Sequence, residues 1–132
     1  MATWDDVDRL SLALPETTGE RHADGTGDWR VRGKSFAWER PLRRSDLAAL
    51  AALGRTAPEP PILAARVPDL GVKEALVEGA AEVYFTVPHF DGYPAVLVRL
   101  PRIQLDELEE LLTDAWLSRA PKRLAAQFLA TR

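Results

Sequence analysis

Two short patterns in the sequence place an aspartate two positions after a histidine: His22 with Asp24, and His89 with Asp91. Imidazole nitrogens and carboxylate oxygens are ligands for zinc, iron or nickel, so a metal site would form if the two loops meet. The alternative is that each histidine fixes its own loop through a hydrogen bond. Because the chain has no cysteine and no histidine pair at helical spacing, we favour the alternative and expect no metal site.

A second group of potential ligands is the acidic run that lies within one expected helix. Oxygen ligands of this kind bind hard cations such as calcium. A solvated helix face is the simpler interpretation, because the first acids of the run also complement the helix dipole. The run consists of Asp106, Glu107, Glu109, Glu110 and Asp114.

Sequence signatures of catalysis are missing from the chain. The absence of cysteine excludes a thiol nucleophile, a thiolate zinc site and a disulfide scaffold. Neither the serine elbow of hydrolases, nor the phosphate-binding glycine loops, nor the zinc-protease motif occurs. We therefore expect a protein that is not an enzyme and has no cofactor.

Basic residues gather in two stretches of an acidic chain, residues 21–44 and residues 115–132. In the first stretch Arg30 and Arg32 alternate with apolar residues, a period typical of a half-buried strand. If helices cover one face of a sheet, these two arginines and the distant Arg99 are expected to point from the other face.

Tyr84 is expected to join that face, which would give an arginine and aromatic surface suited to phosphate contact and base stacking. The alternative, which the residues alone favour, is that ordinary surface arginines solubilise the open face. Trp116 and Trp4 lie on apolar helical stripes and are expected in the core. Trp29 and Trp38 lie on facing strands of the expected hairpin and could pair across it. If either indole points to the open face, it becomes a binding residue instead, and the strand register, which the sequence leaves open, decides this.

The elements that must position these groups follow from periodicity and from Gly and Pro. A capping box at Thr3 starts a helix that Pro15 ends. Residues 17–41 predict a three-stranded antiparallel meander. The remaining expected elements are a helix at 47–53, an irregular proline-rich connection at 56–61, a strand at 62–67, a helix at 69–79, strands at 82–87 and 95–100, a helix from Gln104 through Trp116, and a closing helix that starts at Pro121.

The apolar residues of two expected helices also predict which side of each helix is buried. The helix at 69–79 is expected to bury Val72, Ala75 and Leu76 and to end in a left-handed cap at Gly79. The closing helix is expected to turn Leu124, Phe128 and Leu129 inward.

The order of elements predicts an α+β fold, a single domain over residues 1–132 in which helices pack on one face of an antiparallel sheet. A chain of 132 residues with 46% hydrophobic and 28% charged residues is typical of one globular domain. No apolar run approaches the roughly 18 residues of a membrane span. The acidic N-terminus is unlike a secretory signal, so we expect a cytoplasmic protein without membrane contact.

Four stretches resemble the MmcQ/YjbR-like family of small bacterial proteins. They are Leu14–Glu16, Arg32–Ala37, the loop Pro88–Val96 with the pattern PHxxGYPAV, and Ala115–Trp116 followed by Ala120–Leu124. The loop and the closing pair are the more specific of these. Together they run through nearly the whole chain.

The resemblance implies a frataxin-like fold, also described as a double-wing DNA-binding fold, without established enzyme activity or cofactor. It implies DNA binding on grounds of fold alone, and the candidate surface becomes Arg30, Arg32, Lys34, Arg99 and Tyr84. His89, Trp116 and Lys122 match motif positions without an assigned role. The alternative is a protein- or small-molecule-binding module that uses the same face; frataxin-like metal handling is a third. We expect a monomer or weak dimer.

Overall fold

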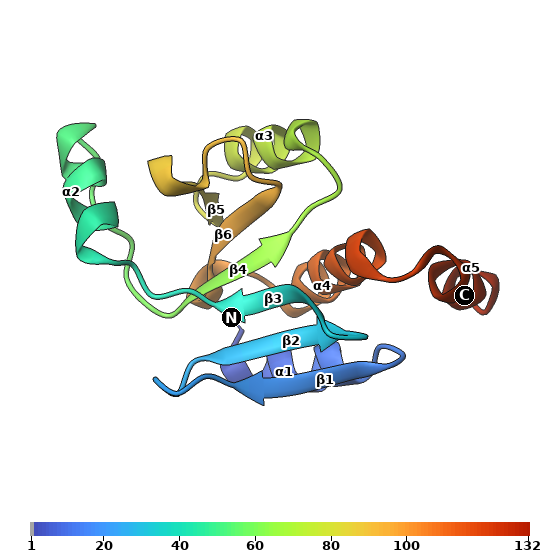
Figure 1. Ribbon diagram of the computed structural model, residues 1–132. Coiled ribbons are helices and arrows are strands. Elements are labelled where there is room, and N and C mark those ends of the chain that lie inside the picture. The colour runs from blue at the N-terminus through green and yellow to red at the C-terminus, as the bar shows by residue number, and fades with distance from the viewer. Residues whose placement is uncertain (1) are drawn as a thin grey trace.

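The computed structural model describes residues 2–132, which fold into one α+β domain around a six-stranded antiparallel sheet (Figure 1). The predicted fold class is confirmed. The helices are α1 (Trp4–Leu12), α2 (Arg44–Ala52), α3 (Leu70–Gly79), α4 (Leu105–Arg119) and α5 (Lys122–Ala130), with short 3₁₀ helices η1 (Pro88–Phe90) and η2 (Leu100–Arg102). The strands are β1 (Thr17–Arg21), β2 (Gly27–Val31), β3 (Lys34–Glu39), β4 (Ile62–Arg66), β5 (Tyr84–Phe85) and β6 (Ala95–Arg99).

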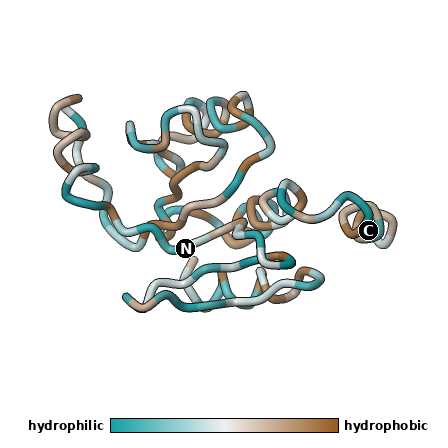
Figure 2. Tube along the Cα trace, viewed as in Figure 1, coloured by the Kyte–Doolittle hydropathy of each residue, from teal (hydrophilic) through white to brown (hydrophobic). Residues whose placement is uncertain are grey.

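The strands are arranged in the order β1-β2-β3-β4-β6-β5, so the predicted meander forms one half of the sheet. The strand expected at residues 82–87 is shorter than predicted, because only Tyr84 and Phe85 pair with β6. Figure 2 shows hydrophobic residues along β6 and mostly hydrophilic ones along the edge strand β1. This contrast follows from burial on both faces in the centre of the sheet and exposure at its edge.

The main core lies between one face of the sheet and helices α1 and α4. The apolar stripe predicted for α4 packs into this core, where Leu108, Leu112 and Trp116 are all completely buried. The Trp116 indole nitrogen donates to the Pro15 carbonyl at 3.0 Å, which ties the last long helix to the end of α1. Leu124 continues this core from α5, whereas Leu129, which we expected inside, is 54% exposed.

The opposite face of the sheet is only half open. A second apolar cluster sits on β4, β5 and β6, where Leu50 of α2 and Phe90 of η1 cover Ala64 and Leu97. Helix α2 otherwise projects away from the body of the domain, at the upper left of Figure 1. The face therefore has an uncovered part over the β1–β3 meander and hollows around α2 and η1.

The helix starts follow local chemistry. The capping box is present as predicted, because the Thr3 hydroxyl accepts from the Asp6 amide and the Asp6 carboxylate accepts from the Thr3 amide. Helix α2 begins earlier than expected, at Arg44, with the buried Asp46 carboxylate accepting from the Arg43 amide at 2.8 Å. Asp69 caps α3 by accepting from the Val72 amide.

The predicted inner face of α3 is correct for Leu76, which packs against the main core, and wrong for Val72 and Ala75. Val72 is 38% exposed and Ala75 is also exposed, whereas Lys73 is buried. The helix is rotated because the Lys73 ammonium reaches the carbonyl groups of the loop after η1. Gly79 is the last residue of the helix and has no left-handed conformation, so the predicted cap is wrong too.

The two tryptophans of the hairpin do not pair across it, and Trp38 points to the open face, which is the alternative that the sequence left open. The register places Trp38 opposite Asp28 and Trp29 opposite Ala37, so the two indoles lie on different faces of the sheet. Trp29 stacks on Trp4 beneath the helices, with ring centroids 6.1 Å apart. Among residues 2–132, none of the helices has both the length and the apolar character that a membrane crossing needs.

Candidate anion-binding site

The arginines expected on the open sheet face lie in different surroundings. Arg30 is on that face, but its guanidinium contacts the buried Asp28 at 2.8 Å and Glu20 at 3.0 Å. Arg32 lies in the turn after β2, at a φ of 47°, and forms a bidentate ion pair with Glu16 at 2.8 and 2.9 Å. Both guanidinium groups are thus neutralised by carboxylates.

The strand register also separates these residues along the sheet. Arg30 is opposite Ser35, near the start of β3. Arg99 is opposite Ile62 of β4, and the neighbouring Leu63 is opposite Glu39, at the end of β3. Arg30 and Arg99 therefore lie at opposite ends of the sheet. Lys34, exposed at the first position of β3, shares the end where Arg30 lies.

Tyr84 faces the helices, contrary to expectation. Its hydroxyl donates to the Glu107 carboxylate of α4 at 2.5 Å, and its side chain is almost entirely buried. Burial, followed by the hydrogen bond to Glu107, raises the pKa of the Tyr84 phenol well above its ordinary value. The residue therefore links the sheet to α4 and does not stand on the face that carries the arginines.

The three motif positions without a role separate into two groups. Trp116 is completely buried and is a core residue. Lys122 is exposed as the first residue of α5, and His89 is exposed on η1. Of these two exposed residues, it is His89 that lines a cavity.

The histidine and aspartate patterns partly meet. His22, Asp24 and His89 line one cavity, but Asp91 does not. Within residues 2–132 no three histidine or carboxylate side chains are grouped so that they hold a metal ion.

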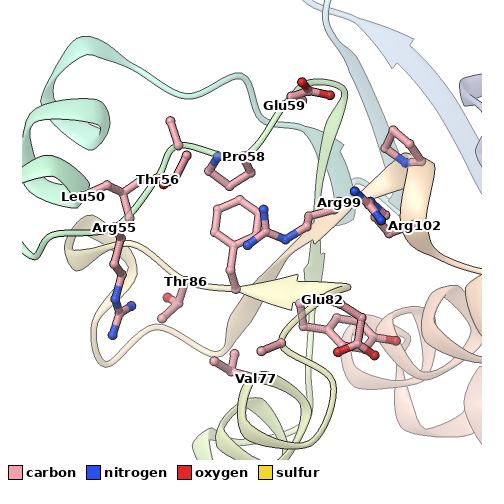
Figure 3. A pocket seen from close by; sticks show the side chains of 15 residues that line it. Leu50, Arg55, Thr56, Pro58, Glu59, Val77, Glu82, Thr86, Arg99 and Arg102 are labelled. Atoms are coloured by element: carbon pink, nitrogen blue, oxygen red, sulfur yellow. The ribbon is translucent and has the colours of Figure 1, made fainter.

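Arg99 instead belongs to a larger cavity of about 830 Å³ between the connector after α2 and the β5–β6 edge. Figure 3 shows Arg99 at its centre with Arg102 beside it, whereas Arg55 extends from the connector along the opposite side of the cavity. Glu59 and Glu82 stand at the rim. The cavity thus combines Arg99 and Arg102, which are three positions apart, with Arg55 from a distant part of the sequence.

Local structure explains how these arginines converge. Arg99 ends β6, and its amide donates to the Val83 carbonyl at 2.8 Å, which fixes the strand end against β5. The chain then turns through η2, which contains Pro101 and brings Arg102 to the same side. Arg55 follows Gly54, whose φ of 71° ends α2 and reverses the chain.

The Arg99 guanidinium is held flat. Its central carbon lies 4.9 Å from the centroid of the Phe85 ring, a cation–π contact. Burial lowers the pKa of Arg99, and the neighbouring charge of Arg102 lowers it further. Within residues 2–132 no carboxylate oxygen comes within 4.0 Å of the guanidinium groups of Arg55, Arg99 or Arg102.

Sequence reasoning identified Arg99 but missed its two partners. The spacing of Arg99 and Arg102 around Pro101 was a usable signal, because a proline at the start of a tight helical turn brings positions three apart to one side. Nothing in the sequence placed the connector carrying Arg55 over the β5–β6 edge.

These features define a small α+β protein with an arginine-lined cavity on one side of an open antiparallel sheet. The chain belongs to the YjbR family, whose model matches residues 12–118. It is 55% identical over 130 residues to "Uncharacterized protein Rv2570" of Mycobacterium tuberculosis strain H37Rv and to "Uncharacterized protein Mb2600" of Mycobacterium bovis. Each alignment covers 98% of both chains. No solved structure matches the chain significantly.

Proposed function

We propose that this protein binds a small anionic molecule, carrying a phosphate or carboxylate group, in the cavity lined by Arg55, Arg99 and Arg102. The observation that carries the proposal is that Arg55, Arg99 and Arg102 line one cavity and that, within residues 2–132, none of them has a carboxylate in ion-pair contact. By contrast, Arg30 and Arg32, the arginines expected to contact phosphates, are both paired with carboxylates.

The electrostatics of Arg99 favour an anion at this position. Burial of a charged group costs free energy unless a partner of opposite charge compensates it. Burial and then the positive charge of Arg102 lower the pKa of Arg99, and the buried Arg99 Nε has no hydrogen-bond acceptor among residues 2–132. An oxyanion that accepts from both guanidinium groups would relieve the repulsion and form charge-assisted bonds.

The remainder of the cavity indicates what else the ligand carries. Phe85, Leu50 and Val77 supply an apolar wall, and the stacking of Arg99 on Phe85 holds the guanidinium plane in place. A cavity of about 830 Å³ lies in the size range of small-molecule sites. The best-fitting ligand has an anionic group at one end and a compact apolar body.

We propose binding without assigning a chemical step, and nucleic acid is the second candidate. The expected double-wing likeness favours DNA, but the support on the surface is weaker, because Arg30 and Arg32 are already neutralised by acids. Phosphate contacts dominate nucleic-acid affinity, and such a surface needs several free cations in a row. Arg55, Arg99 and Arg102, which have no carboxylate in ion-pair contact within residues 2–132, line the cavity instead.

The test uses phenyl phosphate as the probe, with phenol and inorganic phosphate as partial probes, in calorimetric titrations at low salt. Phenyl phosphate should bind more tightly than either partial probe. Arg102→Gln and Arg55→Gln should each weaken it about tenfold, the equivalent of about 1.4 kcal/mol for one charge-assisted bond. Both arginines are exposed, so neither substitution should disturb folding.

Arg123→Gln is the matched control, because it removes one exposed arginine on α5, outside the cavity. If no anion binds, or if Arg123→Gln weakens binding as much as Arg102→Gln, the proposal is wrong. A labelled duplex and a labelled single strand are titrated in parallel. Binding of either strand form that Arg30→Glu weakens and Arg102→Gln leaves unchanged would put nucleic acid in first place.

A further inference from the structure

A second cavity, of about 600 Å³, lies on the same side of the sheet at the other end of α2. Its walls come from the β1–β2 turn, the end of β3 and the loop that contains η1. The side chains that matter for its chemistry are His22, Asp24, Trp38, Glu39, His89 and Tyr93. The cavity brings together the histidines of the two sequence patterns, His22 and His89.

The first histidine is mounted on a rigid hairpin. The His22 amide donates to the Thr26 carbonyl at 2.9 Å, and Asp24 closes the turn by accepting from the Thr26 amide and hydroxyl. The His22 Nε2 lies 3.4 Å from the carboxylate of Asp28, which is 3% exposed and accepts from the Ser35 hydroxyl. Contact with a fixed carboxylate orients the imidazole ring.

The second histidine is on a loop that a buried lysine holds. The Lys73 ammonium donates to the carbonyl groups of Phe90 at 2.6 Å and Tyr93 at 3.0 Å, the residues that flank the turn after His89. Burial lowers the pKa of Lys73, and the nearby charge of Asp91 acts in the opposite direction. Arg66 also donates to the Tyr93 hydroxyl at 3.0 Å. The loop is thus fixed in place at a cost in burial of charge.

Aromatic rings form the interior of this cavity. Trp38 lies against Phe90 with ring centroids 6.4 Å apart, and Tyr93 stands perpendicular to Phe90 at 5.7 Å. Trp38 is half-buried, whereas Trp29 and Trp116 are buried in the core on the opposite face. The indole of Trp38 is therefore the tryptophan available to stack on a bound ring.

The charges of this cavity exclude several ligand classes. Arg40 lies 3.0 Å from the buried Asp46 and is neutralised by it. Of the other charged side chains that line the cavity, Arg43 is positive and Asp24 and Glu39 are negative. The cavity therefore does not favour an anionic ligand. A metal ion lacks a third ligand in the part of the chain described, residues 2–132. A purely aliphatic ligand would leave the polar rim without partners.

We propose that this cavity binds a planar, uncharged nitrogen heterocycle that stacks on Trp38 and hydrogen-bonds to His22, His89 and the carboxylates at the rim. A neutral imidazole offers one donor and one acceptor, and a carboxylate offers acceptors only. Together they match the alternating ring nitrogens and amino groups of a heterocycle such as a purine. The volume accommodates such a ring with a sugar attached.

The experiment follows tryptophan fluorescence during titration with adenosine and guanosine, which carry the heterocycle without a phosphate, and with ribose as the control ligand. We expect saturable quenching by at least one nucleoside and none by ribose. Trp38→Phe should abolish the quenching, and calorimetry should still detect binding to that variant. His89→Ala should weaken the nucleoside about tenfold, as expected when one hydrogen-bonding partner in a desolvated site is removed.

His89 is exposed, so His89→Ala should fold normally, and circular dichroism checks this. Arg123→Gln is again the control, since it lies outside both cavities. Absence of saturable quenching by both nucleosides, or quenching that persists in Trp38→Phe, would refute the inference. Phenyl phosphate binding is measured on the same variants, so failure here is distinguished from failure at the arginine cavity.

Discussion

Trp116→Ala tests whether the packing of α4 and α5 against the sheet stabilises the fold. The Trp116 side chain is 0% exposed, its ring centroid is 4.9 Å from that of Phe128, and its indole nitrogen donates to the Pro15 carbonyl. A fully buried tryptophan removes about 200 Å² from water, which is worth about 5 kcal/mol at 25 cal/mol per Å². Because this area is an upper bound, we expect a loss of about 4 kcal/mol in unfolding free energy.

The measurement is urea denaturation followed by far-ultraviolet circular dichroism. Trp116→Phe separates the two contributions, because it keeps most of the apolar contact and leaves the Pro15 carbonyl without its donor. We expect that variant to lose only about 1–2 kcal/mol. For a chain of this length, 4 kcal/mol corresponds to a fall of about 10–15 °C in Tm. A loss below about 1 kcal/mol for Trp116→Ala would refute the assignment of Trp116 to the core.

Three further predictions concern the other side chains described above. The pKa of Tyr84 is raised in the folded state, so the stability that this residue contributes is complete below the ordinary tyrosine pKa of about 10 and declines as the pH rises above it. In melting curves recorded at alkaline pH, the Tm of Tyr84→Phe should therefore fall less with rising pH than that of the wild type. Gly27→Ala should cost about 1–3 kcal/mol in urea melts, since the new methyl group would lie 2.8 Å from the Trp29 ring, which is stacked on Trp4. Zinc or ferrous iron should leave the Tm unchanged, and a rise that His89→Ala abolishes would contradict the absence of a metal site.

The sequence by itself determined the elements that depend on neighbouring residues. The capping box at Thr3, the meander over residues 17–41 and the buried stripe of α4 were all predicted correctly, because each arises from hydrogen bonds or periodicity within a few positions. The α+β class followed from the order of these elements, and the family from motifs along the chain. Arg99 was identified as a candidate for the same reason, its place on a predicted strand.

Tertiary structure alone decided which residues meet. The face that Tyr84 presents depends on where β5 joins the sheet, and only two paired residues set it. The inner face of α3 was set by the contact of Lys73 with a loop about twenty positions away, which no helical period reveals. Arg55 lines the same cavity as Arg99 because an irregular connector folds back toward the β5–β6 edge, and the path of such a connector has no sequence periodicity. The candidate site is therefore a product of long-range packing, built on elements that local sequence specifies.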